Sequence, residues 1–200
     1  MGMPKVVVIG GPNGAGKSTT APAVLRQALE VHEFVNADAV ALGLSAFDPQ
    51  SVAYAAGRVM LARLHQLAAD QRDFAFETTL ASRSFHPWIQ RLQVLQAYEF
   101  HLIYLWLPSA ELALERVAER VREGGHDVPS DTVRRRYERS LRNFFNLYRP
   151  IADSWLMLDN SSPTRPRAIA WRNRGGPVQV VKTGPWYDLQ KRYEGNFDDD

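Results

Sequence analysis

The sequence predicts an α/β domain in three layers, with a mostly parallel sheet covered by helices on both faces. Short apolar segments rich in β-branched and aromatic residues alternate along the chain with longer segments of helical periodicity, and this alternation is typical of such sheets. The chain has 200 residues, which is enough for one domain with a full core and too few for two large ones. Apolar residues make up 45% and charged residues 23%, as in ordinary globular domains.

In the first half of the chain, three short apolar segments are expected as buried parallel strands: residues 5–9, 34–36 and 74–76. A glycine-rich loop at 10–16 follows the first of them. Helical periodicity predicts helices over 17–30 and 50–69. The core side chains expected in the second of these helices are Val59, Leu61, Leu64 and Leu67.

In the second half, strands are expected at 100–107 and 155–158, and helices over 87–97, 109–122 and 131–148. The strand at 100–107 is apolar almost throughout, which predicts a central position in the sheet. Ser109 can cap the helix that follows, with Glu111 in its first turn. The long helix over 131–148 carries one apolar stripe, formed by Val133, Tyr137, Leu141, Phe144 and Tyr148.

The end of the chain has a different pattern. Residues 167–171 and 178–181 are expected as two strands around a glycine turn, and a short helix near 185–193 follows. This segment is too short to bury a core of its own. We therefore expect one domain, with a core at 1–161, a helical lid near 120–136, and a small β/α extension at 162–200 packed on it.

Composition excludes several classes of protein. There is no cysteine, so disulfides, thiolate catalysis and cysteine-based zinc sites are excluded. The net charge of +2 is small, and an isoelectric point near 9.0 is a weak indication of anionic ligands. No segment approaches the ~18 apolar residues of a membrane-spanning helix, and no signal-peptide pattern is visible. We expect a cytoplasmic protein without a membrane partner.

One motif carries strong chemical information. The segment at 11–19, GPNGAGKST, contains GxxxxGK[ST] between an expected strand and an expected helix, which is the context of a P-loop, or Walker A motif. Glycines let backbone amides point at phosphate oxygens, and the helix start adds positive potential. The residues expected to bind ATP are Gly11, Pro12, Asn13, Gly14, Ala15, Gly16, Lys17, Ser18 and Thr19, with Lys17 at the β/γ-phosphates and Ser18 on Mg²⁺.

ATP binding alone does not identify the reaction. If the protein is a kinase, it needs an acceptor site and a base in addition, and the ends of two expected strands offer candidates for both. Asp38 follows the second strand and is a candidate base or Mg²⁺ ligand, although it can equally cap the next helix. Glu77 and Thr79 end the third strand on the same side, and are candidates to hydrogen-bond a polyol or sugar acceptor. Because the strand at 100–107 ends without a Walker B acid, we expect Mg²⁺ to lie on Ser18 and Asp38.

Arginines surround a glycine break at 124–125, which indicates a mobile lid that can bring guanidinium groups onto the γ-phosphate. Arg116 and Arg120 share one helix face. The next helix contains Arg134, Arg135, Arg136, Arg139 and Arg142. Most of these arginines are expected to be ordinary surface residues, and His126 in the break either contacts phosphate or caps a turn.

Taken together, these residues resemble the zeta-toxin family of P-loop kinases, in the branch often labelled predicted ABC-type ATPase. The matching segments are GPNGAGKST at 11–19, FVNAD at 34–38, FETT at 76–79, YEFHLIYLWLP at 98–108, ERV at 119–121, GGHDVP at 124–129, VRRRY at 133–137 and LDNS at 158–161. The resemblance covers roughly residues 4–161. The ordered set is more specific than the P-loop alone.

The resemblance implies transfer of the ATP γ-phosphate to a hydroxyl of a UDP-activated amino sugar, UDP-N-acetylglucosamine in the best-known members. It implies that Lys17 and Ser18 bind the nucleotide phosphates and Mg²⁺. It also implies that Asp38 is the base, that Glu77 and Thr79 hold the sugar nucleotide, and that Arg120 stabilises the transition state.

The chain departs from the toxins at the lid, which is shorter. Where the toxins place a second lid arginine before a Thr-Pro step, this chain has His126 before Val128-Pro129. Arg134 or Arg135, in the next helix, are candidates to replace it, and we take Arg135 as the second catalytic cation. An identical acceptor, toxicity and an antitoxin partner therefore do not follow from the resemblance.

Three other functions remain open. An ABC-type transport or repair ATPase shares this phosphate loop, but the LSGGQ-like signature and the acid after an apolar strand are absent. Nucleic-acid binding by the arginine-rich helix is disfavoured because its arginines interrupt an apolar stripe and no aromatic stacking surface is evident. Within the kinases, the acceptor is alternatively a nucleoside, an antibiotic or another small alcohol.

Overall fold

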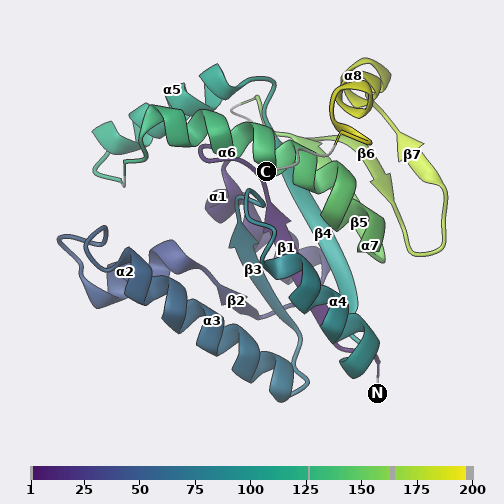
Figure 1. Ribbon diagram of the computed structural model, residues 1–200, viewed down its shortest axis with the longest axis horizontal. Helices are drawn as coiled ribbons and strands as arrows, with labels where there is room; N and C mark the ends of the chain where they lie inside the picture. Colours follow the sequence, from purple (N-terminus) through teal and green to yellow (C-terminus); the bar gives the residue numbers. More distant parts are fainter. Residues whose placement is uncertain (1, 126, 163–164, 197–200) are drawn as a thin grey trace.

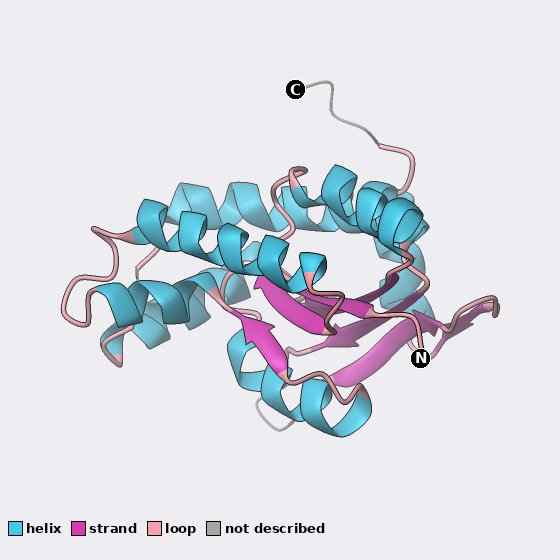
Figure 2. Ribbon diagram, turned by 90° about the horizontal axis from the view of Figure 1, so that it is seen from below, coloured by secondary structure: helices cyan, strands magenta, loops and turns pink. Residues whose placement is uncertain are grey.

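A seven-stranded sheet with helices on both faces forms the structure, a computed structural model that describes residues 2–125, 127–162 and 165–196 (Figures 1 and 2). At positions 23, 24 and 26–28 it describes the backbone only. The strand order is β2-β3-β1-β4-β5-β6-β7, with parallel pairing from β2 to β5 and antiparallel pairing for β6 and β7. The predicted α/β class with a mostly parallel sheet is confirmed.

The strands are β1 (Lys5–Gly10), β2 (Glu33–Val35), β3 (Phe74–Thr78), β4 (Glu99–Trp106), β5 (Ser154–Asp159), β6 (Arg167–Arg172) and β7 (Val178–Val180). The helices are α1 (Lys17–Ala28), α2 (Ala37–Leu44), α3 (Ala53–Ala69), α4 (Phe85–Gln96), α5 (Ala110–Arg122), α6 (Ser130–Asn143), η1 (Phe144–Tyr148), α7 (Arg149–Ile151) and α8 (Thr183–Tyr193). All the predicted strands and helices are present, and α2 is the short helix that was expected beside Asp38. As predicted, β4 is central and mostly buried.

Aromatic side chains fasten three helical segments to one face of the sheet. Phe76 of β3 contacts Trp88 of α4, Tyr104 of β4 contacts Phe144 of η1, and Trp155 of β5 stacks on Trp186 of α8. On each strand, the residues next to these aromatics point to the opposite face of the sheet, because side chains alternate along a strand. There His101, Ile103 and Leu156 line a small pocket together with Leu29, which follows α1. The sheet is therefore buried on both faces at its centre.

The helix α3 corrects part of the predicted core. Leu64 and Leu67 are buried as expected, but Val59 is 47% exposed and Leu61 is 44% exposed, so their assignment to the core was wrong. The buried side chains of α3 are Ala56, Met60, Leu64, Leu67 and Ala68. These recur every three or four residues and form one face, whereas Val59 and Leu61 lie on its two flanks. Position on the helix, and not residue type, therefore decides burial here, because leucines occur both on the buried face and on its flank.

The predicted helix over 131–148 is present, but it changes from an α-helix to a π-helix within that range. The α-helix α6 ends at Asn143 and the chain continues as the π-helical segment η1. The wider turn buries two consecutive aromatics against different partners: Phe144 packs on Tyr104 and Trp155, and Phe145 packs on Trp186 and Tyr193. The predicted apolar stripe of this segment is confirmed, since all five of its residues are buried.

The end of the chain extends the same sheet. As predicted, β6 and β7 form a hairpin around a glycine turn, and β6 pairs with β5. Residues 197–200 lie outside the described residues, and the expected boundary near 161 stays a prediction. Among the residues that the structure describes, no helix has both the length and the apolar character needed to cross a bilayer.

Candidate active site

The phosphate loop runs from the end of β1 to the start of α1. Its last residue before the helix, Gly16, has φ 76°, and Gly14 has φ 75°, so both use the left-handed region that glycine adopts without strain. A side chain at Gly14 would also meet the carbonyl oxygen of Ala113 at 2.7 Å. The sequence therefore needs glycine at these positions to form the compact loop that precedes the helix.

Lys17 is the first residue of α1, and its side chain, which reaches back to this loop, is only 9% exposed. Its Nζ donates hydrogen bonds to the carbonyl oxygens of Gly11 and Pro12, each at 2.9 Å. Burial lowers the pKa of Lys17 from 10.5 to about 8, although the nearby carboxylates of Glu77 and Asp38 act to raise it. The ammonium group is thus held in place at a site where its charge is costly.

Ser18, the next residue, contacts a carboxylate from the neighbouring strand. Its hydroxyl lies 3.0 and 2.9 Å from the two carboxylate oxygens of Glu77, and the side-chain amide of Asn36 lies 3.4 Å from the same hydroxyl. Burial raises the pKa of Glu77, while Lys17 and the hydrogen bond from Ser18 oppose that rise. A hydroxyl and a carboxylate side by side are oxygen ligands of the kind that Mg²⁺ prefers.

Glu77 places a carboxylate beside Ser18 from a strand next to β1. The strand predicted at 100–107, which ends without an acid, is β4, and β1 lies between β4 and β3 in the sheet. On the other side of β1, Glu77 lies at the end of β3, where Gly10 of β1 pairs with Thr78. Glu77 was predicted to contact the acceptor, and the structure places it on the hydroxyl predicted to bind Mg²⁺.

A cleft of about 1010 Å³ opens in front of the phosphate loop. Asp38 at the start of α2 and Thr79 after β3 both line it, as do Lys17 and Ser18. The cap of α2 is Asn36, whose side-chain oxygen accepts hydrogen bonds from the amides of Asp38 and Ala39. Asp38 therefore is not needed as the cap, and its exposed side chain belongs to the cleft. The volume is sufficient for a nucleotide and a second small ligand.

Arginines close the other side of the cleft. Arg116 and Arg120 of α5 and Arg136 of α6 line it, and α5 and α6 lie side by side (Figure 1). Arg120 and Arg136 also act to lower the pKa of Lys17. The segment predicted as the lid, near 120–136, spans the end of α5, the connecting loop and the first half of α6.

The remaining lid candidates lie elsewhere. Arg135 is exposed on α6 and is not among the residues that line the cleft, whereas its neighbour Arg136 is. Arg134 forms an ion pair with Glu111 on α5. His126 lies outside the described residues. Of the three consecutive arginines, the structure therefore brings Arg136 to the phosphate loop.

Several residues of the site come from the segment after β5, which the sequence analysis did not single out by role. Asn160 donates a hydrogen bond from its side-chain amide to the carbonyl oxygen of Ala15, at 2.8 Å. Ser162, Arg165 and Pro166 also line the cleft. The available signal was their place after a buried parallel strand, because ligands of open α/β sheets bind at the carboxyl ends of strands.

Solved structures with a similar fold include chains from two-component systems and a chain described as a kinase. A chain of the AvrRxo1-ORF1:-ORF2 structure with ATP superposes with a TM-score of 0.70 and 15% identity, covering 98% of this chain and 66% of that one. A chain of the PezAT chromosomal toxin-antitoxin system of Streptococcus pneumoniae gives 0.63 and 12%, covering 100% and 82%. A provisionally assigned kinase from Chloroflexus aurantiacus gives 0.60 and 16%, covering 82% and 92%. At these identities the likeness shows the fold.

Sequence comparison shows the family. An uncharacterized protein of Haemophilus influenzae is 30% identical over 135 residues, which are 66% of this chain and 92% of that protein. The family model AAA_33, described as an AAA domain, matches residues 6–147 and so includes the phosphate loop, Asp38, Glu77 and α6. With a kinase-like P-loop fold and a match over more than half of its length, this chain belongs to the AAA_33 family of AAA domains.

Proposed function

We propose that this protein is an ATP-dependent kinase that transfers the γ-phosphate to a hydroxyl group of a small molecule, with a sugar nucleotide like UDP-N-acetylglucosamine as the acceptor. The observation that carries the proposal is the shared cleft: Asp38 lines the same cavity as the phosphate loop, with room for a second ligand. A bare ATPase needs a water molecule there, whereas a kinase needs a base facing an acceptor.

Different residues around the phosphate loop bind different parts of the nucleotide. Backbone amides of the P-loop and the Lys17 ammonium bind the β- and γ-phosphates. Mg²⁺, when bound, neutralises charge on these phosphates, and Ser18, with Glu77 behind it, fits as its oxygen ligands. This assigns to Glu77 a role at the metal in addition to the predicted contact with the acceptor. Asp38 then acts as the base.

In the transfer step, the acceptor oxygen forms a bond to the γ-phosphorus while Asp38 takes the hydroxyl proton. The bond from the γ-phosphorus to the bridging oxygen breaks, and ADP leaves with its new negative charge near Lys17. Arg120 and Arg136 offer guanidinium groups to the oxygens of the transferred phosphoryl group. Thr79 lies in the same cleft and supplies a hydroxyl to position the acceptor.

The comparisons support a nucleotide-dependent transferase but do not extend to the acceptor. One of the similar structures was solved with ATP, and another is described as a kinase. Two come from two-component complexes, one of which is a toxin-antitoxin system. An inhibitory protein partner for this chain is accordingly part of the proposal, as is the sugar nucleotide, which rests on the motifs at 34–38 and 76–79.

The test is a screen of ADP release with UDP-sugars, free sugars and nucleosides as acceptors. We expect release that depends on the acceptor, and a loss of about 10²-fold or more in the Asp38→Asn chain, because a general base contributes that much. Asp188→Asn, at an exposed aspartate of α8 outside the cleft, is the matched control and should retain activity. Release that needs no acceptor and survives Asp38→Asn would contradict phosphotransfer.

A further inference from the structure

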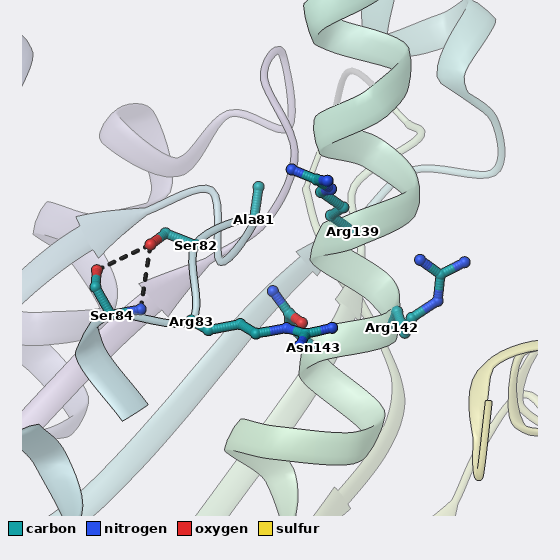
Figure 3. Close-up of a pocket in the computed structure, with 7 residues that line it drawn as sticks. All are labelled: Ala81, Ser82, Arg83, Ser84, Arg139, Arg142 and Asn143. Carbon is teal, nitrogen blue, oxygen red and sulfur yellow. Dashed lines mark hydrogen bonds between the residues drawn. The ribbon is translucent and has the colours of Figure 1, made fainter. Parts of the chain in front are cut away.

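Two parts of the cleft wall are fastened to the rest of the molecule in different ways. On the side of β3, where Thr79 lines the cleft, the segment that follows faces α6 (Figure 3). The side-chain amide of Asn143 donates a hydrogen bond to the carbonyl oxygen of Leu80 at 2.7 Å, and the Tyr148 hydroxyl donates one to the carbonyl oxygen of Ser82 at 2.7 Å. Both donors precede β5 in the chain, so these bonds do not involve its C-terminal segment.

On the side of β5, the cleft wall is formed by residues that follow the strand: Asn160, Ser162, Arg165 and Pro166. At this point the sheet changes from parallel pairing, between β4 and β5, to antiparallel pairing, between β5 and β6. The backbone amide of Asn160 donates a hydrogen bond to the carbonyl oxygen of Trp106 at 3.0 Å, and its side-chain amide reaches Ala15 of the phosphate loop. The conformation after β5 therefore bears directly on the shape of the phosphate loop.

A turn that begins at Asp159, the last residue of β5, holds Asn160 in place. The Oδ1 atom of Asp159 accepts a hydrogen bond from the backbone amide of Ser161 at 2.9 Å. A carboxylate that bonds the amide two residues further on forms an Asx turn, and the residue between them lies at its apex. The carbonyl oxygen of Ser161 accepts a hydrogen bond from the Arg116 guanidinium of α5, also at 2.9 Å. The turn is thus connected both to the phosphate loop and to α5.

The second carboxylate oxygen of Asp159 is held by a residue near the end of the chain. Lys182 lies between β7 and α8, and its Nζ donates a hydrogen bond to Oδ2 of Asp159 at 2.6 Å. The pair is partly shielded from water, since the Lys182 side chain is 32% exposed and that of Asp159 is 12% exposed. Burial acts to raise the pKa of Asp159, but the hydrogen bonds from Lys182 and Ser161 outweigh it and keep that pKa below its usual value. The carboxylate is therefore charged and is held at both oxygens.

Lys182 is poorly suited to the helix that it precedes. It occupies the N-cap position of α8 without making a side-chain capping hydrogen bond, and a cation at the positive end of a helix dipole is unfavourable. Its backbone, in contrast, is well held, because the amides of Val181 and Lys182 both donate to the carbonyl oxygen of Ile169 on β6, at 2.8 and 3.1 Å. The ion pair with Asp159 gives a reason for a lysine at this position that α8 itself does not.

We propose that Lys182 is a positioning residue for nucleotide binding, which acts through Asp159 and Asn160 to hold the phosphate loop in the form that receives ATP. The segment from β6 to α8 thereby sets the affinity of the nucleotide site, although Lys182 is not among the residues that line the cleft. Asp159 and Lys182 both lie beyond residue 147, where the match to the family model ends. The proposal rests on ATP binding at the P-loop, but not on the acceptor or on phosphotransfer.

The test measures the affinity of the full chain for ADP by isothermal titration calorimetry. Lys182→Met removes the charge but keeps a long side chain, and should weaken ADP binding by about fivefold or more, the lower end of the coupling between separate sites in one protein. Lys182→Arg keeps the cation and should bind ADP within about twofold of the wild type. The matched control is Lys191→Met, which removes an exposed lysine of the same helix and should change the affinity by less than about twofold.

A double-mutant cycle tests the path through Asn160. In a chain that already carries Asn160→Ala, the hydrogen bond to Ala15 is gone, so adding Lys182→Met should change the ADP affinity by less than about twofold. Equal losses from Lys182→Met with and without Asn160→Ala would overturn the proposal. Equal losses in Lys182→Met and Lys191→Met, or no loss in either, would overturn it as well.

Amide NMR spectra of the nucleotide-free chain distinguish positioning from a general loss of stability. Lys182→Met should shift the backbone amide resonances of Gly16, which follows the carbonyl that Asn160 contacts, whereas Lys191→Met should leave them in place. If Lys182→Met does not fold, Asp159→Asn takes its place, and an unchanged ADP affinity in that variant would contradict the proposal. If ADP binding depends on Lys182 but no acceptor is phosphorylated, the kinase proposal fails and this one stands.

Discussion

Raising the pH should release nucleotide through a single side chain, Lys17. Its pKa of about 8 means that the ammonium form predominates at pH 7 and is a minor species at pH 9. If only that form binds phosphate well, the dissociation constant scales as one plus ten to the power of pH minus pKa. The apparent dissociation constant of ADP should then rise about tenfold from pH 7 to pH 9. Bound phosphate favours the ammonium form, so near pH 8 binding takes up about half a proton.

Calorimetry in buffers of different ionisation enthalpy measures both the affinity and the proton uptake. Lys17→Arg is the control, because a guanidinium group stays charged throughout this range and should give a flat profile. The reasoning is refuted if wild-type affinity is flat between pH 7 and pH 9, or if Lys17→Arg shows the same slope as the wild type.

Three further variants examine the metal, the loop and the end of the chain. Glu77→Gln should weaken the binding of Mg²⁺-ADP by about tenfold and change the affinity for metal-free ADP by less than about twofold. Titration with and without EDTA measures both affinities. Equal effects on the two would argue against a role of Glu77 at the metal. Asn143→Ala removes the buried hydrogen bond to the Leu80 carbonyl oxygen and should lower the free energy of unfolding, measured in urea, by about 1–3 kcal/mol. A decrease near zero would show that this hydrogen bond does not stabilise the segment after β3. Trp186→Ala removes the stacking on Trp155 and should cost about 3–5 kcal/mol in one cooperative transition, since α8 packs on the same core; two separate transitions would show an independent extension.

Local signals made much of the fold predictable. Strand β1, the glycine loop and α1 follow one another within a few residues, and their apolar and glycine patterns need no distant partner to be interpreted. The same holds for the hairpin of β6 and β7, where the glycine turn marks the bend. The order of strands in the sheet is a different kind of property, because it depends on contacts between distant segments. This is why Glu77 was seen as a polar residue at a strand end but not as the acid beside Ser18.

Side-chain direction was the second property that the sequence left open. Three consecutive arginines on α6 have the same chemistry, and only the packing of that helix decides that Arg136 enters the cleft while Arg135 faces outward. Likewise, Val59 and Leu61 are as apolar as the buried residues of α3, but they lie beside its contact face. The hydrogen bonds from Asn143 of α6 to Leu80 and from Tyr148 of η1 to Ser82 join segments more than sixty residues apart in sequence, which no local pattern reports.

Asn160 has a consequence for when the nucleotide site becomes functional during synthesis. This residue reaches across 145 positions of sequence to the carbonyl of Ala15, and any side chain at Gly16 would collide with its amide. A ribosome-bound chain that has emerged only through β4 contains the whole Walker A motif but lacks this brace. We therefore expect the phosphate loop to take its final form late in translation, once β5 has added to the sheet and Asn160 can reach Ala15.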